Sequence, residues 1–162
     1  MLRNSNAFGP RGFTITELLI SAGIWLFLVL AVVSAYVMLN QIWKEDLTLN
    51  ELSRNANVAV EKMIRGSPLN TGLAAATAIS APAAGSAADD ISYTDLSGTS
   101  RRFYYSTNSI YNISGAAIVS DVGSVTFTNV QDSIIIIDLK LFRYVGNKAI
   151  RFSISTQVSL KN

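Results

Sequence analysis

The feature that most limits what this chain can fold into is an uncharged apolar run near its N-terminus. Leu18–Leu39 reads LLISAGIWLFLVLAVVSAYVML, 22 residues in which only two serines and one tyrosine carry polar side chains. About 20 apolar residues in an α-helix span the hydrocarbon core of a bilayer. A cleavable signal peptide has a shorter apolar segment followed by a small-x-small cleavage site. A helix in a soluble core rarely stays apolar on every face. The run therefore predicts a membrane-spanning helix.

The charges on either side of the run predict its orientation. Residues 1–12 carry two arginines and no acid, whereas Lys44-Glu45-Asp46 follows the run with one more acid than base. The positive-inside rule then places the N-terminus in the cytoplasm and the C-terminal part outside. The chain has 13 basic and 11 acidic residues, and the leader arginines account for the excess. The sequence pI of about 9.0 therefore does not indicate a nucleic-acid-binding body.

One acidic residue, Glu17, directly precedes the run. A carboxylate costs about 2.5–3.5 kcal/mol at the bilayer centre and less near an interface. Glu17 could simply mark the membrane edge. If the chain is cut after Gly12, Glu17 instead lies one turn inside a helix that begins at Phe13. An acid in the first turn also interacts favourably with the helix dipole.

The string Arg11-Gly12-Phe13-Thr14-Ile15-Thr16-Glu17, followed by this helix, resembles the prepilin processing motif of type IV pilins and type II secretion pseudopilins. The resemblance implies that residues 1–12 are a leader, which a membrane prepilin peptidase removes by cutting between Gly12 and Phe13. It implies N-methylation of the new terminus at Phe13. It also implies that Glu17 pairs with the terminal amine of a neighbouring subunit, which would offset the cost of burying a carboxylate.

The helical pattern continues beyond the apolar run. A stop signal follows at Gly66 and Pro68, so we predict one helix over 13–65. Residues 13–39 would lie in the membrane or filament core, and the second half would pack on a sheet. Trp43 is predicted to anchor the helix at the membrane interface. The face predicted to pack comprises Ile42, Leu49, Leu52, Ala56, Ala59 and Met63.

The remainder of the chain divides into two parts. The Ala/Ser/Gly-rich segment 66–90 predicts a flexible connecting loop, with a subunit contact as the alternative. Residues 91–162 predict an antiparallel β-sheet head with one face on the helix. The expected strands are 91–94, 101–106, 109–113, 124–128, 133–141 and 150–160, with a hairpin turn at Gly146-Asn147. The fold predicted is α+β, a long helix packed on an antiparallel sheet, which is also the pilin architecture.

The composition excludes much catalytic chemistry. The chain contains no histidine and no cysteine, which removes a Ser-His-Asp triad, a cysteine nucleophile and an H-E-x-x-H zinc site. We expect no enzyme activity and no cofactor. Asp89, Asp90 and Asp95 form the densest acidic cluster. They could bind calcium, but solvated acids in turns are the simpler interpretation.

The segment Arg101–Tyr105, Arg-Arg-Phe-Tyr-Tyr, could stack on single-stranded nucleic acid. A neutral body and one arginine pair make a poor phosphate groove, so we do not expect nucleic acid as a partner. A strand with basic residues at its start is the simpler interpretation.

The sequence as a whole predicts a structural subunit that assembles through its hydrophobic helix after processing. The Tyr/Phe-rich hairpin over 101–113 and the closing strand that ends with 158–162 resemble the larger minor pilins and pseudopilins, often called the J or W type. The absence of a proline from the apolar helix, which many major pilins have, fits that resemblance. The alternatives are a major pilin subunit and a single-pass membrane-anchored binding domain. Expected partners are other subunits, the prepilin peptidase, an inner-membrane assembly platform and, before assembly, the lipid bilayer. The expected location is the inner membrane, then a periplasmic or extracellular filament.

Overall fold

The computed structural model describes residues 13–66, 71–131 and 133–160. The chain forms two compact units, Met1–Trp43 and Lys44–Asn162. Helix α1 (Ile15–Arg65) contributes to both units and confirms the long helix predicted from the sequence. It begins two residues after the predicted start at Phe13.

Helix α1 ends where the glycine signal predicts. Gly66 has φ +81°, and its N–H donates to the carbonyl of Lys62 at 2.8 Å. Such a left-handed residue after the last turn is a common helix stop. The chain then returns across the helix end, where the N–H of Gly72 donates to the carbonyl of Arg65 at 3.3 Å. The other predicted stop residue, Pro68, lies outside the described residues.

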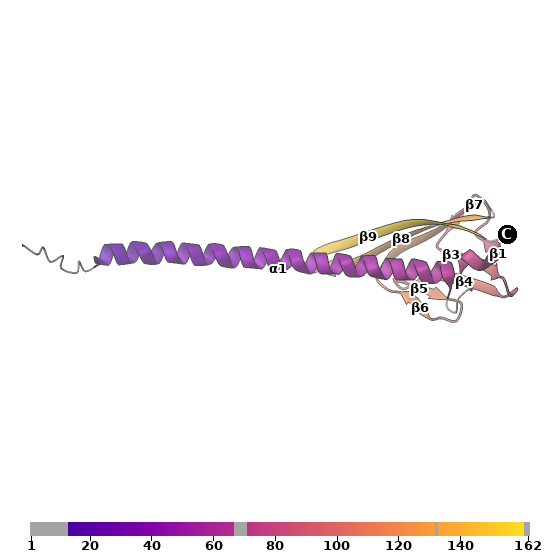
Figure 1. Ribbon diagram of the computed structural model, residues 1–162, viewed down its shortest axis with the longest axis horizontal. Helices are drawn as coiled ribbons and strands as arrows, with labels where there is room; N and C mark the ends of the chain where they lie inside the picture. Colours follow the sequence, from indigo (N-terminus) through magenta and orange to yellow (C-terminus); the bar gives the residue numbers. More distant parts are fainter. Residues whose placement is uncertain (1–12, 67–70, 132, 161–162) are drawn as a thin grey trace, which may run out of the picture. The chain divides into compact units, whose positions relative to one another are not determined.

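The second unit contains two antiparallel sheets rather than the single sheet expected from the sequence (Figure 1). The division into two sheets was not predictable, because it depends on β1 pairing with β3 and β2 pairing with β7, which are not neighbours in the sequence. The five-stranded sheet has the order β1-β3-β4-β5-β6, comprising β1 (Ala76–Ala81), β3 (Asp90–Asp95), β4 (Ser100–Ser106), β5 (Ser109–Asn112) and β6 (Ala117–Val119). The four-stranded sheet has the order β2-β7-β8-β9, comprising β2 (Ala87–Ala88), β7 (Val122–Gln131), β8 (Ile134–Val145) and β9 (Lys148–Ser159).

The prediction of a loop over 66–90 is wrong for much of its length. A 3-10 helix, η1 (Leu73–Ala75), leads directly into β1, and β2 follows. Strand β1 pairs with β3 and β2 pairs with β7. Alanine is depleted in strands, but hydrogen bonds to an established neighbour outweigh that weak preference.

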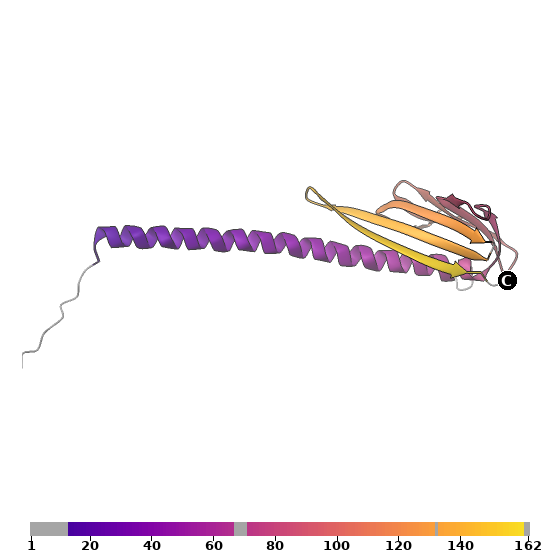
Figure 2. The same ribbon diagram turned by 90° about the horizontal axis from the view of Figure 1, so that it is seen from above.

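The core lies between α1 and the inner faces of the sheets; Figure 2 shows β7, β8 and β9 running over the second half of the helix. Ile42 and Leu49 were predicted on the packed face of the helix, but both are exposed. The face of the helix that packs on the sheets therefore starts further along the chain than the spacing of the apolar residues suggested. The helix contributes Leu52, Ala56, Ala59, Val60 and Met63 to the core.

Strand β8 explains the four consecutive isoleucines at 134–137. It is a central strand, hydrogen-bonded to β7 and β9 on its two sides. Ile135 and Ile137 are fully buried, whereas Ile134 and Ile136 on the other face are half-buried. The predicted hairpin turn at Gly146-Asn147 joins β8 to β9, since Val145 pairs with Lys148.

Ion pairs join the helix to the β8–β9 hairpin within the second unit. Arg143 on β8 donates to Glu51 on α1 and to Asp121 before β7, each at 2.6 Å. Near the hairpin turn, Lys148 pairs with Glu45 on α1. The hairpin is thereby fixed beside the first residues of this unit.

Candidate functional site

The candidate assembly site is the first turn of α1, where Thr14 and Glu17 form a reciprocal cap. The backbone N–H of Thr14 donates to Glu17 Oε2 at 3.0 Å, and the N–H of Glu17 donates to Thr14 Oγ1 at 3.3 Å. The Thr14 hydroxyl also donates to Glu17 Oε2 at 2.9 Å. This is a capping box, which satisfies two backbone donors that a helix start leaves without partners.

The capping box explains why the helix begins at Ile15. Thr14 is the N-cap and Glu17 is the third helical residue, so its carboxylate faces back toward Phe13. The role of Thr14 was missed in the sequence analysis, although Thr-x-x-Glu before an apolar run is its known signature. Phe13 is described and is 81% exposed, whereas Gly12 and the rest of the predicted leader lie outside the described residues.

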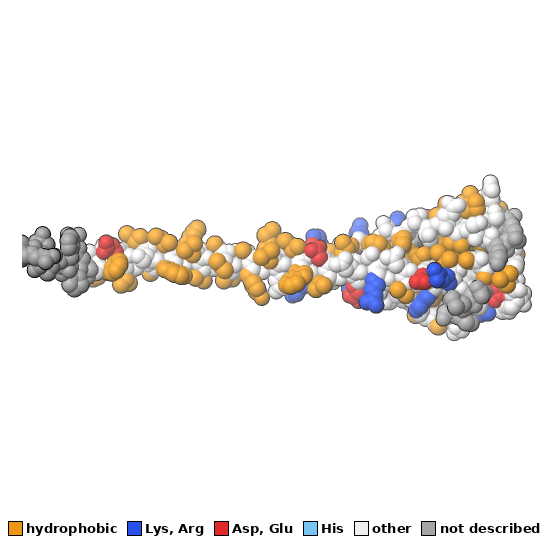
Figure 3. All heavy atoms as spheres, in the orientation of Figure 1, with side chains coloured by type: hydrophobic (Ala, Val, Ile, Leu, Met, Phe, Trp, Pro, Cys, Tyr) orange, Lys and Arg blue, Asp and Glu red, His pale blue; other side chains and the backbone are white. Residues whose placement is uncertain are grey.

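The rest of the first unit is an apolar helical surface. Every residue from Phe13 to Trp43 is exposed, including all the large apolar side chains. Figure 3 shows hydrophobic side chains along this part of the helix, with acidic atoms near its start. By length and composition, α1 could cross a membrane. A surface this apolar on all sides requires lipid or other apolar helices around it.

One of the polar side chains within the apolar run, Ser34, is compatible with that environment. The Ser34 hydroxyl donates to the carbonyl of Leu30 at 2.8 Å, within the same helix. A side chain satisfied in this way does not need a water partner. Trp43, the predicted interfacial anchor, is 70% exposed and lies at the end of this unit. Its anchoring role stays a prediction.

The acidic cluster of the head does not form a metal site. Among the described residues, no group of three or more acidic, histidine or cysteine side chains could hold a metal ion. Asp89 is exposed, and Asp90 accepts two hydrogen bonds from Arg102, at 2.6 and 3.1 Å. The interpretation of these acids as solvated is wrong for Asp95, which is 2% exposed.

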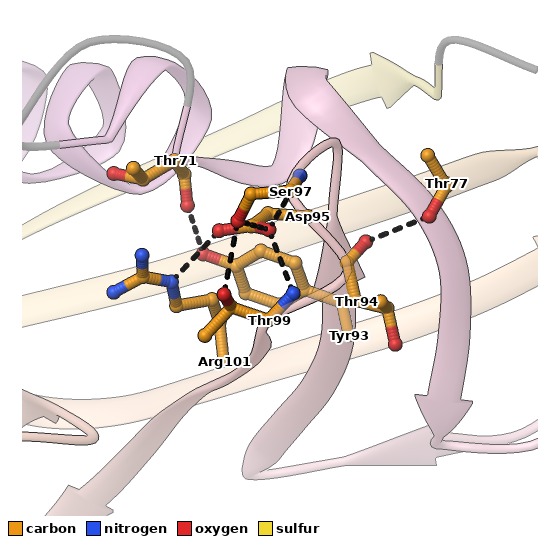
Figure 4. Close-up of polar contacts among 8 residues, drawn as sticks. All are labelled: Thr71, Thr77, Tyr93, Thr94, Asp95, Ser97, Thr99 and Arg101. Carbon is orange, nitrogen blue, oxygen red and sulfur yellow. Dashed lines mark hydrogen bonds and ion pairs between the residues drawn. The ribbon is translucent and has the colours of Figure 1, made fainter.

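Asp95 organises the turn between β3 and β4 (Figure 4). Its Oδ1 accepts hydrogen bonds from the Ser97 hydroxyl at 2.5 Å and from the backbone N–H groups of Ser97 and Thr99. Its Oδ2 accepts from Arg101 Nε at 3.0 Å. These hydrogen bonds, above all that from the Ser97 hydroxyl, lower the pKa of Asp95 to about 2. Its role is therefore structural.

We expect Asp95 to make the head sensitive to acid. The pKa of Asp95 is lower in the folded chain than its ordinary value of 3.8. Its contribution to the stability of the head is therefore complete above about pH 4. Stability is lost as the pH falls from there toward about 2. The free energy of urea unfolding should be measured against pH for wild type and for Asp95→Asn. Between about pH 4 and 2 the wild-type value should fall more steeply than that of the variant, by a slope that corresponds to at most one more proton taken up on unfolding. The exposed control Asp89→Asn should follow wild type; a curve matching that of Asp95→Asn would contradict the assignment.

The side chains of the Arg101–Tyr105 segment make their contacts within the five-stranded sheet and the core. Arg101 bonds Asp95, and Arg102 bonds Asp90 and lies 5.6 Å from the centre of the Tyr104 ring. Phe103 is buried in the core. The segment thus lies in strand β4 with its basic residues near the start, which confirms the simpler interpretation of its sequence. The pairing of both arginines with aspartates of β3 was not predicted.

Comparison with protein-family models, with curated proteins and with solved structures gave no match.

Proposed function

We propose that this chain is a structural subunit of a type IV pilus or type II secretion filament, in the class of minor pilins and pseudopilins. In this proposal a prepilin peptidase removes residues 1–12, and the apolar helix then leaves the membrane to pack against the helices of other subunits. The C-terminal head remains on the outer side of the membrane. No catalytic activity is proposed.

The observation that carries this proposal is the fully exposed apolar surface of residues 13–43, which begins at the capped polar turn Thr14–Glu17 inside the motif that resembles a processing site. An ordinary membrane anchor requires the apolar surface but no acidic residue at its start. A subunit that must exchange lipid for neighbouring helices requires a specific polar contact to set its register. The carboxylate of Glu17 could supply that contact if it meets a cation.

The experiment that tests the proposal is mass spectrometry of the N-terminus of the membrane-extracted protein, from cells with an active prepilin peptidase. We expect a chain that starts at N-methylated Phe13. Gly12→Val should leave the chain unprocessed, because the bulky side chain precedes the bond to be cut. The matched control Gly9→Val, in the same leader, should be processed as wild type is.

An intact Met1 terminus in wild type would contradict the proposal and favour a single-pass membrane-anchored binding domain. If processing is confirmed, the abundance of the chain in purified filaments separates the remaining alternatives. A major pilin would dominate the filament, whereas a minor pilin or pseudopilin would be a small fraction of it.

A further inference from the structure

Strand β9 forms one edge of the four-stranded sheet and pairs on one side only, with β8 (Figure 2). Its 12 residues pair with β8 in a single register without a bulge. In the same register, the N–H of Leu160 donates to the carbonyl of Ser133 at 2.8 Å. Because hydrogen-bonded and non-hydrogen-bonded pairs alternate in an antiparallel ladder, the backbone groups of the even-numbered β9 residues face β8. Those of the odd-numbered residues face away from the sheet.

These outward backbone groups have no partner in the part of the chain that the structure describes. No hydrogen bond to another described residue involves the backbone of the four odd-numbered residues in the middle of β9, namely Arg151, Ser153, Ser155 and Gln157. We call the outward backbone groups of these four residues the β9 edge. A strand of another polypeptide could pair with the β9 edge without disturbing the hydrogen bonds between β8 and β9.

The other edges of the two sheets are short or irregular. Strand β2 has two residues and β6 has three. Strand β1 has six residues, but its pairing with β3 shifts register twice. Such features protect the edges of natural sheets from pairing with other chains. Strand β9 is long, has no bulge and no proline, and carries Arg151 as its only charged residue after Lys148. It is therefore the edge that remains suited to pairing.

The inner face of β9 is incompletely covered. Ile150 and Val158, near the ends of the strand, are buried in the core. Between them, the inward-facing residues are only half-buried: Phe152, Ile154 and Thr156. An added strand would place alternate side chains beside these three. Apolar side chains at those positions would complete the burial, so the segment that binds this edge needs apolar residues at alternate positions.

The outer face of the sheet adds a requirement for charge. Arg151 is exposed, and so is Lys140, which lies on the same face as the pairing partner of Ser153. Neither cation forms an ion pair with a described residue. Asp138 also lies on this face, opposite Ser155, so the positive charge is concentrated toward the hairpin turn. Opposite charges on neighbouring strands attract, so an acidic residue on an added strand would pair with Arg151.

We propose that the β9 edge binds an extended segment of another protein, which adds to the four-stranded sheet as a fifth strand. Its alternate apolar residues cover Phe152 and Ile154, and an acidic residue between them pairs with Arg151. In this mode of recognition, backbone hydrogen bonds provide affinity and side chains provide specificity. The inference uses contacts within the second unit alone. It does not depend on processing or on filament assembly, so it can hold or fail independently of the proposed function.

Hydrogen exchange of individual amides tests the β9 edge on the full chain in detergent. Without a ligand, the amides of Phe152 and Ile154 should be protected by β8, whereas those of Ser153 and Ser155 should exchange freely. The probe is a labelled peptide in which valine and glutamate alternate, and the comparison peptide has lysine in place of glutamate. With the glutamate peptide at about ten times its Kd, exchange at Ser153 and Ser155 should slow about 10-fold. The lysine peptide at the same concentration should protect them less.

Two pairs of variants separate the backbone contribution from the charge. Ser153→Pro removes an N–H that β8 does not use, so the fold should persist while peptide binding is lost. Ser153→Ala keeps this N–H and should bind as wild type does. Arg151→Gln should weaken binding of the glutamate peptide by at most about 5-fold, because an opposite-charge pair across strands contributes up to about 1 kcal/mol. Arg54→Gln, at an exposed helix position, should leave binding unchanged.

The proposal fails if the amides of Ser153 and Ser155 are as protected as their neighbours in the free monomeric chain. It also fails if both peptides bind equally well. A third contrary result is equal binding by Ser153→Pro and Ser153→Ala while the amides of Phe152 and Ile154 stay protected. Protection that increases with the concentration of the chain, without peptide, would assign the β9 edge to a second copy of this chain instead.

Discussion

Glu17→Gln should give a chain that is inserted, processed and folded but yields few or no filaments. A glutamine can still close the capping box with Thr14, because the third helical position of this motif accepts Glu or Gln. It has no charge to pair with the terminal amine of a neighbouring subunit. Losing one partner of a buried ion pair costs about 3–5 kcal/mol, which is more than 100-fold in each assembly contact. Filaments sheared from cells and quantified by immunoblot would measure the loss.

Two further variants separate the charge of Glu17 from its capping role. Thr14→Val removes the capping hydroxyl but keeps the carboxylate, and should cost about 1 kcal/mol at the helix start with a modest loss of filaments. Glu17→Ala removes both functions and should resemble Glu17→Gln. If Glu17→Gln assembles normally while Thr14→Val and Glu17→Ala do not, Glu17 is only a cap and the proposed intersubunit pairing is wrong.

Gly66→Ala should destabilise the head by roughly 3 kcal/mol. A left-handed conformation costs a residue with a Cβ about 1–2 kcal/mol. The new Cβ would also lie 2.3 Å from the backbone nitrogen of Gly72, and overpacking of this kind typically costs about 1–3 kcal/mol. Urea unfolding of the full chain in detergent, followed by near-UV circular dichroism of the tyrosines, would give the free energy of unfolding. Both tryptophans lie outside the head, so they do not contribute head signals.

Two other glycines resolve the contributions to this effect. Gly72 has φ −90°, so Gly72→Ala introduces no strain from a left-handed conformation, but its Cβ would meet Gly66 N at 2.3 Å. Gly115 has φ +77° and nothing within 4 Å of a Cβ, so Gly115→Ala introduces that strain alone. We expect Gly115→Ala to cost about 1 kcal/mol and Gly72→Ala to cost more. Equal effects at Gly66 and Gly115 would show that the close approach of the two glycines has no energetic importance.

The elements predicted well from the sequence are those whose signals are local. Helix α1 follows from an apolar run and a periodic pattern, and its end follows from Gly66. Strands β8 and β9 are rich in β-branched residues and are separated by a Gly-Asn turn, so the hairpin was predictable. In the candidate site, Glu17 was identified because a carboxylate beside an apolar run carries a free-energy cost of transfer into the membrane.

The elements missed are those that form through distant partners. Strand β1, with sequence ATAISA, has little intrinsic strand preference and exists because β3 lies beside it. The burial of Asp95 was missed because its partner Arg101 comes from the next strand. The placement of Lys140 and Arg151 on one face of the sheet was also missed, because it follows only from the register of β8 and β9.

The order of the chain has a consequence for biogenesis. The helix residues of the core, such as Leu52 and Met63, are synthesised early, whereas Val158 and Leu160 on and beyond β9 are the last core residues to be made. Contacts between such distant segments form slowly. The ribosome therefore releases the apolar helix well before the head can close over its second half. Insertion of α1 into a membrane during synthesis would therefore precede closure of the head, so folding of the head would not drive it.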